Sequence, residues 1–308
     1  MLDPWSQPRQ CEFSIIFSLY EKVLQNIKKD LIIYKNAPLP FIGQKRQFLT
    51  HYTEILNQYI SGDGQGWTII DAFGGSGLLS DVAKRIKPAA RVIYNDFDNY
   101  AERLLHIDEI NELRLKISDT IGNTIPKNKK LTPDVKSKVI NVIQFFQGYK
   151  DLNCLASWLL FSGNQVGSLE DLFNKDFWHC VRQSDYPRAD GYLDGIEIIQ
   201  ESFHQLLPKF RDEPNTLFVL DPPYLCTRQE SYRQASYFDL IGFLRLIHLT
   251  RPPYIFFSSS KSEFVRFIDA MVEDKWDNWQ AFENYGKISI NTSASYSGKY
   301  EDNMVFKF

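Results

Sequence analysis

Residues 67–86 read WTIIDAFGGSGLLSDVAKRI, the pattern of a buried strand, a glycine-rich turn and a helix. Glycines at 74, 75 and 77 let the backbone leave the strand sharply and approach a ligand closely. A second apolar strand, ARVIYNDFD at 90–98, places Asp96 nineteen residues after Gly77. At this spacing a carboxylate often grips the ribose hydroxyls of a nucleotide-type ligand. A purely structural turn with a capping Asp96 would give the same pattern, so this stretch leaves both interpretations open.

Further strand-like segments alternate with helical ones along the rest of the chain. The strands are expected at 196–203 (IEIIQESF), 215–224 (NTLFVLDPPY), 252–260 (PPYIFFSSS), 287–291 (KISIN) and 303–308 (NMVFKF). Helical patterns cover 11–34, the segment after FIGQK at 41–45, and about 238–249. Strands that alternate with helices predict a mainly parallel sheet whose ligands bind at the carboxyl ends of the strands.

The segment 101–195 differs in character, since it holds helices and polar loops and no strand that would extend the sheet. We therefore expect an inserted domain there, with a catalytic domain formed by 38–100 and 196–308 and a helical extension at 1–37. Within the insertion, Thr132 is a suitable cap and Pro133 suits the first helical turn. This predicts a helix that runs to about Phe146, before Gly148.

Composition places the chain among folded globular proteins, with 308 residues, 44% apolar and 24% charged residues. Its 35 Lys and Arg against 38 Asp and Glu give a net charge of −3, so a polyanion must meet a local basic patch. No segment has the roughly 18 apolar residues of a membrane helix, and no secretion signal precedes the first helix. Four dispersed cysteines predict reduced thiols, a cytoplasmic location and no metal site.

The tetrapeptide Asp221-Pro222-Pro223-Tyr224 follows a strand and carries the most specific chemistry. The prolines cannot donate ladder hydrogen bonds, so the chain leaves the sheet rigidly and presents a carboxylate, a carbonyl and an aromatic ring together. An exocyclic amino group on a purine or pyrimidine is a poor nucleophile because its lone pair is delocalised. Hydrogen bonds to Asp221 and to the Pro222 carbonyl would stabilise the charge that develops on that nitrogen during attack, while Tyr224 stacks on the base.

The order of FIGQK, DAFGGSG, NDFD, a long insertion, IIQESF and DPPY resembles the Dam-like adenine-N6 DNA methyltransferases, the alpha group. The resemblance spans about 38–100 and 196–308. It implies an α/β fold: a Rossmann-like S-adenosylmethionine-dependent methyltransferase sheet with helices on both faces and an inserted, mainly helical recognition domain. It also implies that S-adenosylmethionine is the cofactor, that double-stranded DNA is the partner and that the base is flipped. Methyltransferases of this group serve restriction-modification or phage self-protection, and the resemblance extends to members carried by phages and prophages.

The resemblance implies a site role for each residue of this sequence that matches a family motif. Phe41 and Lys45 match the first family motif, in which the lysine faces the methionine carboxylate of the cofactor. The remaining cofactor-binding residues that it implies are Asp71, Phe73, Gly75, Gly77, Asp96, Ser202, Phe203 and Asp221. The catalytic residues that it implies are Asp221, Pro222, Pro223 and Tyr224. Ser202 replaces an aspartate common in relatives, and Asp98 adds a carboxylate to the family's Asp-Ile-Asn.

Contacts to DNA are expected from a lysine-rich segment and from the loop after DPPY. Between Lys127 and Lys150 six lysines face one acid, Asp134, a local balance of 6 − 1 = +5. The candidates are Lys127, Lys129, Lys130, Lys136, Lys138, Arg228, Tyr232 and Arg233. A solvated surface explains the lysines equally well. We expect a monomer.

Two other functions stay open on the sequence. Related tetrapeptides serve amino-group methyltransferases that act on RNA or on a protein Gln or Asn. A nucleic-acid-binding module that has lost catalysis would keep the fold, but the intact Asp221, Tyr224, Lys45 and Asp96 argue against it. A nicotinamide oxidoreductase is disfavoured because the glycines read G-G-S-G and the chain offers no convincing hydride-handling site.

Overall fold

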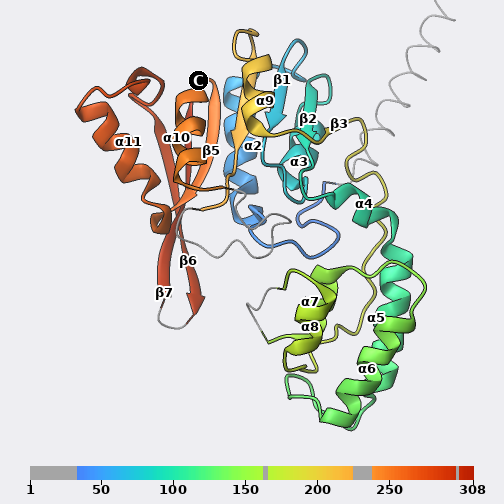
Figure 1. The fold of residues 1–308 in the computed structure, drawn as a ribbon. Helices are drawn as coiled ribbons and strands as arrows, with labels where there is room; N and C mark the ends of the chain where they lie inside the picture. Colours follow the sequence, from blue (N-terminus) through green and yellow to red (C-terminus); the bar gives the residue numbers. More distant parts are fainter. Residues whose placement is uncertain (1–32, 162–165, 225–237, 296–297) are drawn as a thin grey trace, which may run out of the picture. The chain divides into compact units, whose positions relative to one another are not determined.

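In the computed structural model, which describes residues 33–161, 166–224, 238–295 and 298–308, seven strands form one mixed sheet (Figure 1). Their order across the sheet is β3-β2-β1-β4-β5-β7-β6. The strands are β1 (Thr68–Asp71), β2 (Arg91–Asn95), β3 (Glu197–Ile199), β4 (Thr216–Leu220), β5 (Tyr254–Ser259), β6 (Gly286–Ser295) and β7 (Gly298–Lys307). The first five pair in parallel, whereas β7 is antiparallel to both β5 and β6. This sheet confirms the predicted Rossmann-like methyltransferase fold class.

Helices cover both faces of the sheet, because successive strand side chains point to opposite sides. Ile69 of β1 belongs to the apolar cluster of α2 (Leu49–Tyr59) and α3 (Leu78–Ile86). Ile70 belongs to the cluster of α9 (Phe203–Lys209), α10 (Leu240–Leu249) and α11 (Phe264–Glu273). Short 3-10 turns complete this part: η1 (Arg46–Phe48), η2 (Ser260–Ser262) and η3 (Trp279–Ala281). All residues of β4 and β5 are buried, as expected for strands covered on both faces.

Between β2 and β3 the described residues contain helices and no strand of the sheet. The helices are α4 (Tyr100–Leu105), α5 (Ile107–Ile121), α6 (Pro133–Phe145), α7 (Leu152–Leu159) and α8 (Leu169–Asn174). Tyr34–Phe308 form one compact unit that includes these helices. The division into a catalytic domain and an insertion at 101–195 therefore stays a prediction.

Helix α6 begins where local chemistry predicts. The Thr132 hydroxyl accepts a hydrogen bond from the Val135 amide, and Pro133 occupies the first turn. The helix ends at Phe145, one residue before the predicted Phe146. A cap and a proline within two positions are local signals, so no distant contact was needed to locate this start.

One prediction of secondary structure is wrong in its extent, and one helix had no prediction. The strand expected at 196–203 is only Glu197–Ile199, because the Ser202 hydroxyl accepts from the His204 amide and starts helix α9. Helix α11 was not predicted. Almost all of the helix predicted at 11–34 lies outside the described residues, as do Arg228, Tyr232 and Arg233.

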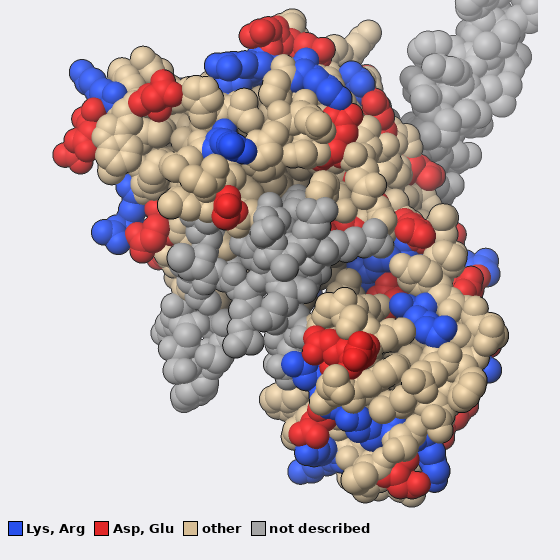
Figure 2. Space-filling view, in the orientation of Figure 1, with Lys and Arg blue, Asp and Glu red and all other residues tan. Residues whose placement is uncertain are grey.

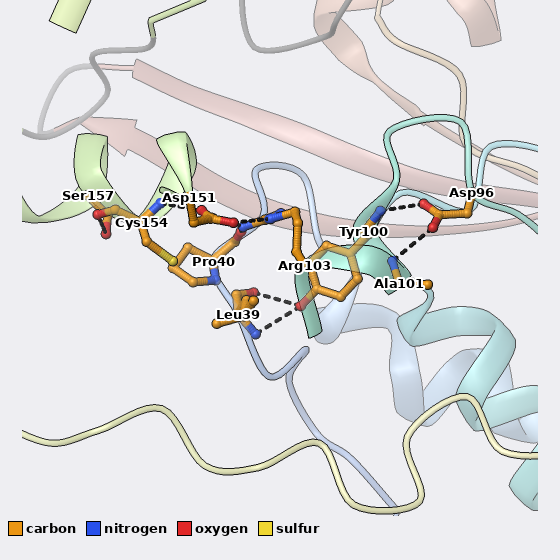
Figure 3. Close-up of polar contacts among 9 residues, drawn as sticks. All are labelled: Leu39, Pro40, Asp96, Tyr100, Ala101, Arg103, Asp151, Cys154 and Ser157. Carbon is orange, nitrogen blue, oxygen red and sulfur yellow. Dashed lines mark hydrogen bonds and ion pairs between the residues drawn. The ribbon is translucent and has the colours of Figure 1, made fainter. Parts of the chain in front are cut away.

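A buried ion pair links α4 to α7 (Figure 3). Two nitrogens of Arg103 donate to the two carboxylate oxygens of Asp151, at 2.5 and 3.1 Å, and these side chains are 7% and 2% exposed. The same guanidinium donates to the Pro40 carbonyl at 2.9 Å, and the Tyr100 hydroxyl bonds the backbone of Leu39. Asp151 also caps α7 by accepting from the Cys154 amide. The loop before η1 is thereby held against both helices.

None of the helices in the described part of the chain is both long and apolar enough to cross a membrane.

Replacing Asp151 by alanine should lower the free energy of unfolding by about 3–5 kcal/mol, because the buried Arg103 charge would lose its partner. The matched control is Asp108→Ala, which removes an exposed pair with Arg188 in which both side chains are 71% exposed. This control should cost less than about 1 kcal/mol. Urea denaturation measures both variants, and equal losses would contradict the buried pair's role.

Candidate active site

The carboxyl ends of four parallel strands bring predicted site residues to one edge of the sheet. Asp71 ends β1, Asp96 follows β2, Ser202 follows β3 and Asp221 follows β4. The strands pair in register there, with Asp71 opposite both Tyr94 and Val219. Side chains separated by up to 150 positions in the sequence therefore meet because parallel strands end together.

Lys45 reaches this edge from the loop that precedes η1. Its Nζ lies 2.5 Å from Asp221 Oδ2 and donates to the Gly43 carbonyl at 2.8 Å. The side chains of Lys45 and Asp221 are only 9% and 17% exposed. The ammonium group also lies 5.5 Å from the centre of the Tyr224 ring, within the range of a cation–π contact. The first motif and DPPY, both predicted from sequence, are thus in direct contact.

Asp71 is buried beside this ion pair. Its Oδ2 accepts from the Ser80 hydroxyl at 2.7 Å, whereas its Oδ1 is buried and has no hydrogen-bond partner among the described residues. Burial raises the pKa of Asp71 to about 7, and the nearby Asp221 charge adds to this rise while Ser80 and Lys45 oppose it. We call Asp71, Lys45 and Asp221 the acid–lysine cluster.

Burial also raises the pKa of Asp221. Lys45 opposes this rise through its charge and its hydrogen bond, and Asp302 of β7 adds to it. The terminal antiparallel strand therefore contributes to the electrostatics of the site, a role that sequence reasoning did not assign to Asp302. No pattern around Asp302 signals it, since its place depends on β7 pairing with β5.

The glycine turn is packed between two aromatic rings. Gly75 and Gly77 have φ of 52° and 73°, which favours glycine at both positions. A Cβ on Gly75 would lie 2.8 Å from the Phe41 ring, and one on Gly74 would lie 2.1 Å from the Tyr94 ring. The Tyr94 hydroxyl donates to the Gly75 carbonyl and is 2.9 Å from Asp96 Oδ1. Tyr94, which sequence reasoning missed, lies within hydrogen-bonding distance of two predicted site residues, Gly75 and Asp96.

Asp96 caps helix α4 (Figure 3). Its Oδ1 accepts from the Tyr100 amide and lies 2.9 Å from the Tyr94 hydroxyl, and its Oδ2 accepts from the Ala101 amide. The capping role that the sequence left open is therefore real. A carboxylate has about four acceptor sites, so at least one remains for a further donor such as a ribose hydroxyl. That ribose contact stays a prediction.

Ser202 and Phe203 lie at the start of α9, beside the end of β1. The Phe203 ring is 5.3 Å from the Phe73 ring and 5.9 Å from the Phe238 ring, measured between centroids. Phe203 is 7% exposed, so most of its surface already packs against protein. Their predicted position beside the adenine of a cofactor is not tested by these contacts.

The lysine-rich segment is not a continuous positive face. Lys130 pairs with Asp176 and Lys138 with Asp134, while Lys127 and Lys136 donate to backbone carbonyls. Figure 2 shows acidic and basic residues interspersed over the visible face of the helical region. The net charge of +5 counted over residues 127–150 does not include Asp176, which lies outside that range. These ion pairs are exposed and weak, so contact of Lys127, Lys129, Lys130, Lys136 and Lys138 with DNA stays a prediction.

The cluster fits the amino-acid end of the cofactor that the sequence implies. The orphaned Asp71 Oδ1 is an acceptor suited to an ammonium group, and Lys45 Nζ is a donor suited to a carboxylate. The spare acceptor site on Asp96 suits a hydroxyl. No group of three or more His, Cys, Asp or Glu side chains among the described residues is arranged to hold a metal ion.

Comparison with known proteins gives one strong match. No protein-family model matches the chain. A protein of Haemophilus influenzae described as "Putative methyltransferase" is 66% identical over 275 residues, which cover 89% of this chain and 93% of that protein. A solved structure from Clostridium thermocellum, described as "putative rRNA-methylase", is 11% identical, with a TM-score of 0.31 over 84% of this chain and 97% of its own. That structural likeness is too low to carry any inference.

Gly74→Ala should destabilise the protein by about 1–3 kcal/mol, because its Cβ would overlap the ring of the fully buried Tyr94. Gly167→Ala is the control, since nothing lies within 4 Å of a Cβ there. Thermal unfolding compares the two. A Gly74→Ala protein as stable as the control would show that the turn has room to move.

Asp71→Asn should change how stability depends on pH. A folded pKa of about 7 lies above the ordinary 3.8, so the folded state binds a proton that the unfolded state releases between these values. Wild-type stability should therefore fall as pH rises from about 4 to 7, and the variant should gain up to about 4 kcal/mol relative to wild type by pH 8. Urea titrations at pH 4.5 and 8 measure this, and a difference independent of pH would contradict it.

Proposed function

The chain belongs to the same methyltransferase family as the Haemophilus influenzae protein, and from this premise we propose that it methylates the N6 amino group of adenine in double-stranded DNA, with S-adenosylmethionine as donor. The observation that carries the proposal is the contact of Asp221, first residue of DPPY, with Lys45 at the strand edge beside Asp71. The proposal includes base flipping and a monomer that acts in the cytoplasm.

The geometry of DPPY supports a site for an amino group. The β4 ladder ends at Leu220, and the buried Pro222 and Pro223 follow without an amide hydrogen to donate. Asp221 and Tyr224 remain partly exposed, so a carboxylate and an aromatic ring are accessible at a rigid corner. A flipped base that stacks on Tyr224 could direct its amino hydrogens to Asp221 and to the Pro222 carbonyl.

Lys45 favours the ionised form of the Asp221 carboxylate. Only the ionised carboxylate accepts from an amino group with both oxygens, and burial opposes ionisation. The ammonium group of Lys45 offsets that effect and fixes one oxygen, Oδ2. The second oxygen can then face the target nitrogen.

S-adenosylmethionine, when bound, supplies an electrophilic methyl group and leaves as a neutral thioether. Asp221 and the Pro222 carbonyl stabilise the positive charge that the amino nitrogen acquires as its bond to carbon forms. The surplus proton of that nitrogen goes to solvent. Asp71, Lys45 and Asp96 hold the donor and orient its methyl group, which supplies proximity.

The direct test incubates purified protein with labelled S-adenosylmethionine and unmethylated genomic DNA, followed by mapping of modified adenines. We expect label on adenine N6. Label on RNA and none on DNA would replace the proposal by RNA methylation, and label on a protein Gln or Asn would replace it by protein methylation. DNA binding without transfer would identify a binding module.

Asp221→Ala should lower kcat at least about 10²–10³-fold, because the developing charge would lose its acceptor. The affinity for S-adenosylmethionine, measured by calorimetry, should change only a few-fold. Asp212→Ala is the control, because this exposed residue lies just before the opposite end of β4. Turnover within a few-fold of wild type in Asp221→Ala would place amino-group activation elsewhere.

A further inference from the structure

An open cavity of about 440 Å³ lies between the loop 36–46 and the segment 182–186 of the helical region. Polar side chains that line it are Asn36, Gln44, Arg46 and Arg182. Among the described residues that line it there is no Asp or Glu. The volume of the cavity is within the range of small-ligand sites. Its two charged lining residues, Arg46 and Arg182, are both positive.

Both walls of this cavity are held by hydrogen bonds. On the loop side, Gln44 Oε1 accepts from the Ala37 amide, and Leu39 bonds the buried Tyr100 hydroxyl (Figure 3). On the other side, Tyr186 exchanges backbone hydrogen bonds with the Asn111 side chain, and its hydroxyl accepts from Trp158. A cavity with fixed walls is prepared for a ligand before the ligand arrives.

The two arginines are suited to an anion. Neither Arg46 nor Arg182 forms an ion pair with an acidic residue in the described parts of the chain. The Arg182 guanidinium lies 4.0 Å from the centre of the Tyr186 ring, which orients its plane, and one of its nitrogens donates to the Ser184 hydroxyl. Arginine's planar fork matches the oxygens of a phosphate in two parallel hydrogen bonds.

The cavity and the acid–lysine cluster share the same loop. Gly43 lines the cavity, and its carbonyl accepts from Lys45 Nζ, which in turn bonds Asp221. Gln44 and Arg46, on either side of Lys45 in sequence, also line the cavity. The loop that lines the cavity is therefore also the loop that contacts Asp221 through Lys45.

We propose that this cavity binds a backbone phosphodiester next to the target base, with Arg46 and Arg182 as the contacting groups. The inference rests on the proposed function, because a nucleic-acid substrate places the phosphate there. Phosphate contacts position a strand without reading its sequence. The site thus fixes the strand relative to Asp221.

The test measures binding of a fluorescent DNA duplex by anisotropy between 50 and 200 mM salt, for Arg46→Gln, Arg182→Gln and the control Arg211→Gln. Arg211 is exposed and lies beyond α9, before the amino end of β4. Each cavity variant should reduce the slope of log K against log salt by about 1, whereas the control keeps it. In methylation assays the variants should raise KM for DNA and keep kcat within a few-fold.

A second measurement separates a lost contact from a damaged fold. A duplex with one methylphosphonate, placed in turn at each phosphate near the target adenine, removes a single charge. One position should weaken binding of wild type clearly more than binding of Arg46→Gln or Arg182→Gln, because each variant has already lost one of the two partners of that phosphate. If every position weakens both proteins equally, or if the salt slopes of the variants equal that of wild type, the cavity does not bind phosphate.

The outcomes also separate this inference from the proposed function. If wild type methylates DNA and the cavity variants behave as the control, the phosphate-binding role of the cavity is overturned and the proposed function stands. Wild type that methylates only RNA would overturn the DNA assignment, and the same variants measured with an RNA probe would then decide the cavity. Wild type that neither binds nor methylates DNA or RNA would overturn both.

Discussion

The buried pair of Arg103 and Asp151 is the constraint on which the site depends, because it is the point where three separate parts of the chain are joined. Arg103, which belongs to α4, donates to the Pro40 carbonyl in the loop before η1. Asp151 caps α7 by accepting from the Cys154 amide. Asp96 caps the same α4 from the end of β2. A buried ion pair is seldom the most stabilising choice, since desolvation offsets much of its attraction. The hydrogen bond from Arg103 to Pro40 fixes the start of the loop that carries Lys45, so the ion pair helps to position that lysine.

At the other end of that loop, three acidic side chains surround one cation, Lys45. The Asp221 charge raises the pKa of Asp71, the Asp302 charge raises the pKa of Asp221, and Lys45 opposes both rises. In a region of low dielectric constant such charges interact strongly. A ligand that brings an ammonium group and a carboxylate would complete this arrangement, because it supplies one charge of each sign to partners already in place.

Much of this site could be predicted from sequence, because its parts are local patterns. The strand and glycine turn at 67–77, the exit at Asp221 and the cap at Thr132 each depend on neighbouring residues only. The contact between Lys45 and Asp221 spans 176 positions, and no pattern within either segment specifies that distance; only resemblance to a family suggested that both belong to one site. Tyr94 and Asp302 gained their roles from strand pairing. The lysine count could not include Asp176 for the same reason, since this residue lies outside the counted window and approaches Lys130 only in space. In the strand predicted at 196–203, a serine cap overrode an apolar pattern.

The strand order has a consequence for how the chain acquires its shape during synthesis. In the finished sheet β1 lies between β2 and β4, yet β4 begins only at Thr216, some 145 residues after β1 ends at Asp71. At about 5–20 residues per second, a ribosome takes between about 7 and 29 s to make that stretch. Throughout this interval one side of β1 has no neighbouring strand to pair with. The helices made in between can already pack on one another, so the nascent chain holds a partly built sheet beside a formed helical region until the second half of the sheet emerges.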